Sequence, residues 1–93
     1  MQADARDGGL RDDARRLLRV SYERQVAGGG GVTHVDLGAG AEELGMDAGG
    51  ARLGVLLDYM DVMGWVEKDL FARDARATAR RITARGLAVV GEA

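Results

Sequence analysis

The spacing of hydrophobic residues predicts a first helix that begins at Asp12 or Asp13 and reaches about Val26. An aspartate at its first position accepts hydrogen bonds from the free N–H groups of the first turn. The inward residues of this helix are expected to be Leu17, Leu18 and Ser21. Residues 28–31 are all glycine. They end the helix, because four consecutive glycines do not form a helix interior.

Two further helices are predicted, joined by a short turn. The first covers roughly 36–44, with Thr33 or Asp36 as its cap, and ends at Gly45. The second covers about 48–63, with Asp47 as its cap, and ends at Gly64. Their inward residues are expected to be Leu37, Ala41 and Leu44 in the first helix, and Leu53, Leu56, Leu57 and Met60 in the second. Two helices joined by about three residues form a helix-turn-helix.

Extended segments lie around these helices. Val32–Val35 forms a short extended piece, and Trp65–Asp69 and Ala77–Ile82 are predicted to be two strands of a hairpin. The second strand places Thr78, Arg80 and Ile82 on one face, because side chains alternate along a strand. Thr83 then caps a last short helix that carries Leu87 and Val90.

The order of these elements predicts a winged helix-turn-helix, mainly α with a small antiparallel β-sheet. Residues 1–9 are polar and are expected to form a flexible N-terminus. Residues 10–93 are expected to form one winged-helix domain, with the wing at about 65–82, since 93 residues suffice for a single small core. No apolar run approaches the length of a membrane span, so a cytoplasmic protein without a membrane partner is expected.

Charge is unevenly distributed along the chain, which carries a net charge of -2. Residues 32–64 hold one Arg and six acidic residues, a balance of -5. Residues 73–85 hold five Arg and one Asp, a balance of +4. A basic segment on an acidic domain is a candidate contact for a polyanion, because it attracts phosphate locally.

Short motifs around the predicted wing resemble those of the MarR-like bacterial transcription regulators. Asp74-Ala75-Arg76 resembles the family's wing motif, and residues 81–86 (Arg-Ile-Thr-Ala-Arg-Gly) resemble its junction into the next helix. The resemblance covers roughly residues 14–90 and rests on the order and spacing of short motifs. It implies that the third helix enters the major groove of DNA and that Arg76, positioned by Asp74, reaches the minor groove or the backbone. The long helices with which full-length MarR proteins dimerise have no counterpart in this chain.

The expected function is therefore that of a small DNA-binding protein, a transcriptional regulator whose partner is double-stranded DNA. Arg52 is the only basic residue of the third helix, and it is a possible donor to a guanine edge or a phosphate. The same helix also carries the acidic Asp58. The candidate DNA-binding residues are Arg52, Tyr59, Arg73, Asp74, Arg76, Arg80 and Arg81.

A protein-binding module without DNA affinity is the alternative function. It would use an outward face made by Val55, Tyr59 and Val62. A symmetric homodimer is also expected, paired through Leu10 and Val20 of the first helix. Glycines 49, 50 and 54 are expected to permit close packing of one helix on another, and close approach of the backbone to DNA is the alternative.

Enzyme chemistry, metals and cofactors are not expected. Val35–Gly40 resembles the glycine loop of methyltransferases that bind S-adenosylmethionine, but that loop requires a parallel sheet, and helical segments follow it here. Gly38 and Gly40 are therefore expected to be small residues within the second helix. The chain has no Cys, and its single His34 has no second ligand in sequence, which argues against a metal site. Ser21 has no base nearby, so nucleophilic catalysis has no support.

Overall fold

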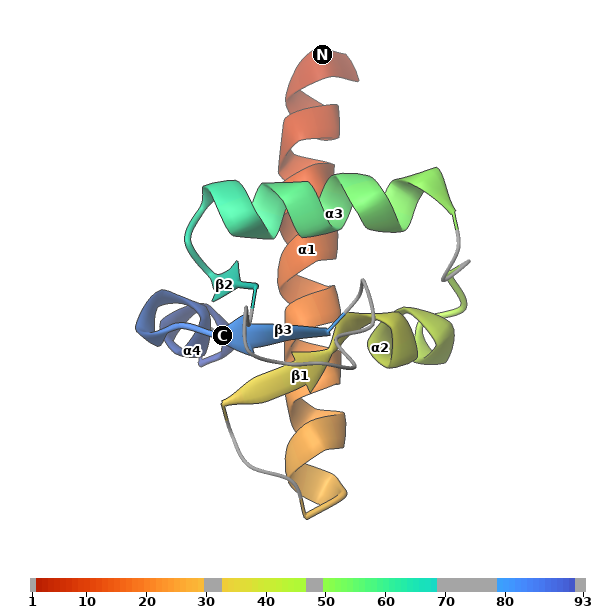
Figure 1. Cartoon of the computed structure of the whole chain (residues 1–93). Coiled ribbons are helices and arrows are strands. Elements are labelled where there is room, and N and C mark those ends of the chain that lie inside the picture. The colour runs from red at the N-terminus through yellow and green to blue at the C-terminus, as the bar shows by residue number, and fades with distance from the viewer. Residues whose placement is uncertain (1, 30–32, 47–49, 69–78, 92–93) are drawn as a thin grey trace.

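The protein folds around one long helix. The computed structural model describes residues 2–29, 33–46, 50–68 and 79–91, with side chains from Gly9 onward. The helices are α1 (Gln2–Ala27), α2 (Leu37–Glu43), α3 (Ala51–Val62) and α4 (Ala84–Val90), and the strands are β1 (His34–Asp36), β2 (Val66–Glu67) and β3 (Ala79–Ile82). Figure 1 shows the shorter elements in front of α1, with α3 crossing it. The fold is mainly helical with a small antiparallel sheet, as predicted, and is consistent with a winged-helix-like arrangement.

Helix α1 begins at Gln2, well before the predicted start at Asp12 or Asp13. The predicted inward residues Leu17, Leu18 and Ser21 are all buried. Periodicity located only the part of α1 that packs against other elements, because the polar residues before it follow no apolar pattern. In Figure 1 the N-terminal turns of α1 extend beyond α3.

Helices α2 and α3 follow one another as predicted, but α2 ends at Glu43 and α3 begins at Ala51, farther apart along the chain than the predicted turn of about three residues. Asp36 caps α2, because its Oδ1 accepts hydrogen bonds from the Gly38 N–H at 3.0 Å and the Ala39 N–H at 3.2 Å. Gly45 follows α2 with a φ of 78°, the left-handed conformation that glycine adopts without strain. Helix α3 begins at Ala51 after Gly50, while the predicted cap Asp47 lies outside the described residues.

The core lies between α1, α2, α3 and the sheet. All four residues predicted to face inward from α3 are buried, as are Leu37 and Ala41 of α2, whereas Leu44 is partly buried. Gly40 lies directly against α1, since a Cβ there would fall 2.0 Å from Ser21 Oγ. The prediction that Gly54 permits helix packing is wrong, because Gly54 is exposed and, apart from its chain neighbours and the backbone of its own helix, no described heavy atom lies within 4 Å of its Cβ position.

The sheet has the order β1-β3-β2, with β3 antiparallel to both neighbours. The predicted hairpin is confirmed by the pairing of Val66 with Ile82 and of Glu67 with Arg81. Arg80 and Ile82 are both buried on the inner face, as the predicted alternation requires, and Thr78 lies outside the described residues. Strand β1 pairs with the other edge of β3 and packs against α1.

Thr83 connects α4 by hydrogen bonds to the residues that follow α3. Its Oγ1 accepts a hydrogen bond from the Gly86 N–H at 3.1 Å, which confirms the predicted cap, and lies within hydrogen-bond reach of the Gly64 and Trp65 carbonyl oxygens. Among the apolar side chains of α4, Val89 is buried and Leu87 is 41% exposed. Leu10, one of the two residues predicted to pair in a homodimer, is partly buried and packs against the core.

Candidate nucleic-acid interface

Four of the seven predicted DNA-binding residues belong to the described part of the protein. Arg52 and Tyr59 lie on α3, and Arg80 and Arg81 lie on β3. Arg73, Asp74 and Arg76, the tip of the predicted wing, lie outside the described residues. The structure therefore describes α3 and the strands β2 and β3, which lie on either side of the predicted wing tip along the chain.

The outer face of α3 combines one cation with small and apolar side chains. Arg52 is exposed near the start of the helix, and its Nη2 donates to Asp13 Oδ2 of α1 at 2.7 Å. Val55 is 46% exposed and Val62 is 85% exposed, with the exposed Asp58 between them along the chain. The helix can thus offer one guanidinium to a partner, with Val55, Asp58 and Val62 exposed farther along the same helix.

Tyr59 is packed rather than free. Its ring lies 5.5 Å from that of Trp65 in an edge-to-face arrangement with an interplanar angle of 82°. The Arg11 guanidinium of α1 lies 5.4 Å from the centre of the Trp65 ring. Because Trp65 is buried, Tyr59 holds the end of α3 to the core and presents only part of its surface to a partner.

Arg80 is an internal residue. Its side chain is 8% exposed, its Nε lies 3.6 Å from Asp61 Oδ1 of α3, and its Nη1 donates to the Ala79 carbonyl at 3.0 Å. The prediction had grouped Arg80 with the basic surface of the wing. Its side chain is buried and connects β3 to α3.

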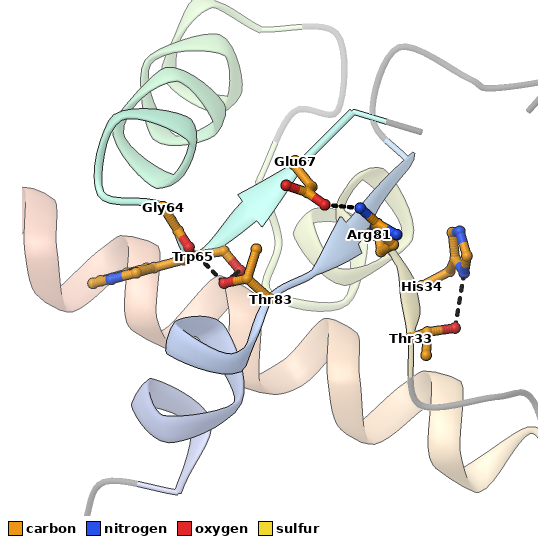
Figure 2. A network of polar contacts seen from close by, with 7 residues as sticks. All are labelled: Thr33, His34, Gly64, Trp65, Glu67, Arg81 and Thr83. Atoms are coloured by element: carbon orange, nitrogen blue, oxygen red, sulfur yellow. Dashed lines mark hydrogen bonds and ion pairs between the residues drawn. The ribbon is translucent and has the colours of Figure 1, made fainter. Parts of the chain in front are cut away.

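Arg81 lies on the outer face of the sheet, in a row of three polar residues. Its Cα pairs with His34 of β1 on one side and with Glu67 of β2 on the other. Residues directly opposite in antiparallel strands share a face, and the Arg81 guanidinium is ion-paired with the Glu67 carboxylate (Figure 2). His34 in turn lies beside Thr33, whose Oγ1 is 3.0 Å from His34 Nδ1.

A further cation lies beside the connection of α2 and α3. Arg16 of α1 is exposed and lines a hollow of about 230 Å³ together with Asp13, Arg52, Leu44 and Met46. Sequence patterning did not identify Arg16, Asp13 or Glu67 as parts of the site. The carboxylate partners come from other elements, and only the helix crossing and the strand register bring them to the arginines.

The exposed side chains described above can recognise charge. Among residues 9–29, 33–46, 50–68 and 79–91, no group of His, Asp and Glu side chains is arranged to hold a metal ion. None of the described helices is both long enough and apolar enough to cross a membrane. Each of α1, α3 and β3 carries an exposed arginine, namely Arg16, Arg52 and Arg81.

Comparison with known proteins gives no relative from which a role can be transferred: the chain matches no protein-family model, no curated protein and no solved structure.

Proposed function

We propose that this protein binds double-stranded DNA and acts as a small transcriptional regulator of the winged-helix type. One observation carries the proposal: α3 and the sheet pack on the same side of α1 (Figure 1), and each presents an exposed arginine. These are Arg52 on α3 and Arg81 on β3. A helix and a strand hairpin side by side, each with a cation, are the two elements with which a winged helix meets a groove and its flanking phosphates.

Each element has a distinct part in the proposed complex. A single α-helix fits the major groove, where Arg52 reaches a guanine edge or a phosphate. Arg81 at the base of the wing contacts the DNA backbone. Its charge there helps to fix the position of the protein on the duplex but does not read the base sequence. The resemblance to MarR-like regulators implies that Arg76, positioned by Asp74, is the residue of the wing tip that reaches DNA. A narrow minor groove attracts such an arginine strongly.

Salt-titrated binding to a random-sequence duplex tests the proposal. Affinity should fall steeply and linearly on a log–log plot against salt, because each neutralised phosphate releases counterions. Arg76→Ala should weaken binding several-fold and reduce the slope by about one unit, and Arg76→Lys should recover only part of the loss. Failure of the wild-type protein to bind duplex DNA at low salt would refute the proposed function.

Asp74→Ala separates a positioned wing arginine from a general basic patch. Loss of this carboxylate leaves Arg76 to be ordered only on binding, so affinity should fall although a negative charge has been removed. Simple charge attraction predicts a gain in affinity instead. A gain would leave DNA binding intact and would contradict the MarR-like arrangement of the wing.

A protein partner is the second candidate function, favoured by the exposed Val55 and Val62 on α3. Exposed apolar residues on one helix face are typical of contact with another protein, including a second copy of the same chain. Val55→Asp should then abolish self-association in sedimentation at tens of micromolar protein. If the protein sediments only as a monomer, the homodimer proposal falls.

A further inference from the structure

The two exposed arginines of the proposed interface are both already held by carboxylates of other elements. We propose that Asp13 and Glu67 are intramolecular competitors of DNA phosphate, which must be displaced from Arg52 and Arg81 before these residues bind DNA. The inference rests on the proposed function and adds to it a built-in limit on affinity.

Asp13 holds Arg52 across two helices. The Asp13 Oδ2 atom lies 2.7 Å from Arg52 Nη2, the distance of a charge-assisted hydrogen bond. A carboxylate on a guanidinium occupies the position that a phosphate oxygen takes in a nucleic-acid complex, because both anions use the same donors. Asp13 also lines the hollow that contains Arg16. When Asp13 moves away, two cations flank the same space.

Glu67 holds Arg81 across two strands. The two residues are direct partners in the antiparallel register, so the backbone keeps their side chains on the same outer face. Their contact is an ion pair between Arg81 Nη2 and Glu67 Oε1. A phosphate that approaches Arg81 from solvent therefore meets a guanidinium whose Nη2 already contacts a carboxylate.

Exposure makes these two pairs displaceable. The side chains of Arg52 and Asp13 are 50% and 44% exposed, and those of Arg81 and Glu67 are 54% and 48% exposed. Exposed ion pairs are weak, so displacement of each should reduce DNA affinity by no more than about fivefold. The pair of Arg80 and Asp61 differs, because the Arg80 side chain is only 8% exposed and cannot exchange its partner for phosphate.

The test uses neutral isosteres of the two carboxylates. Asp13→Asn and Glu67→Gln should each tighten binding to a random duplex about two- to fivefold at low salt. This gain should shrink as salt rises, because screening weakens the competing pair. Glu42→Gln on α2 is the matched control, since it removes one exposed negative charge that is not part of either pair. It should give less than half of the gain.

A double-mutant cycle separates competition from simple repulsion between a carboxylate and DNA. If Glu67 acts through Arg81, the gain from Glu67→Gln should fall to the level of the Glu42→Gln control when Arg81→Gln is also present. Asp13→Asn should behave in the same way in combination with Arg52→Gln. An undiminished gain in these backgrounds would overturn the inference while leaving DNA binding in place.

The outcomes distinguish the inference from the function on which it rests. Absence of duplex binding by wild type and by both isosteric variants refutes both proposals together. Binding by wild type with no gain in either variant refutes competition alone. Urea unfolding followed by the fluorescence of the buried Trp65 should show that each variant retains the wild-type fold.

Discussion

Addition of one methyl group should have opposite effects on stability at Gly40 and at Gly54. Both glycines lie inside helices, where alanine is favoured over glycine by about 1 kcal/mol. At Gly54 the new Cβ meets open space, so Gly54→Ala should stabilise the protein by about 0.4–1 kcal/mol. At Gly40 the Cβ would lie 2.0 Å from Ser21 Oγ and 3.2 Å from Ser21 Cα. Rotation of the serine side chain relieves only the first contact, so α2 must move away from α1.

Overpacking of this kind costs about 1–3 kcal/mol, and the gain in helix propensity offsets only part of it. Gly40→Ala should therefore destabilise the protein by about 1–2 kcal/mol. Urea unfolding followed by Trp65 fluorescence and by far-UV circular dichroism measures both variants. With a slope of about 1 kcal/mol per molar urea, the two midpoints should lie about 1.5–3 M apart.

A partner substitution on α1 tests the cause of the Gly40 effect. Ser21→Ala removes the Oγ that the new methyl group would meet, together with the hydrogen bond of 2.7 Å to the Leu17 carbonyl. Combined with Gly40→Ala, it should cost less than the sum of the two single changes. Strict additivity, or a Gly40→Ala variant as stable as wild type, would show that α1 and α2 are not in the close contact described above.

Three further changes probe the core and its connections by the same unfolding measurement. Leu57→Ala should destabilise by roughly 2–5 kcal/mol through lost burial and a cavity, and a loss below about 0.5 kcal/mol would contradict its place in the core. Thr83→Ala should cost about 1–2 kcal/mol because α4 loses its cap, whereas Thr83→Ser should be close to wild type. Asp61→Ala should cost at least about 1 kcal/mol by leaving the Arg80 guanidinium buried without its carboxylate, and a neutral result would mean that solvent reaches this pair.

The extent to which the fold was predictable differs between elements. The leucine stripe of α3 was predicted residue by residue, because helical periodicity directly records which side is buried. The buried side of α4 was not, since this helix has only seven residues and apolar side chains on several faces. The early start of α1 was missed because a polar helical segment leaves no periodic signal.

The candidate site shows a different limit of sequence patterning. Alternation along β3 correctly placed Arg80 on the same face as Ile82, but it does not show that this face is the inner one. Asp61, which lies on another element at 3.6 Å from Arg80 Nε, helps to make the burial of this arginine tolerable. Likewise, the pairing of Arg81 with Glu67 follows from the hairpin register, which is fixed only when the two strands meet.

The central position of β3 in the sheet delays the completion of the fold during synthesis. Strand β3 supplies the hydrogen-bond partners of both β1 and β2, yet it follows both of them along the chain. A nascent chain that has emerged only as far as β2 therefore has its α3 leucines available for packing but two strands without partners. Folding of the domain as a unit must wait until Ile82 has left the ribosome, and exposed strand edges make that interval the one in which the chain is most prone to aggregate.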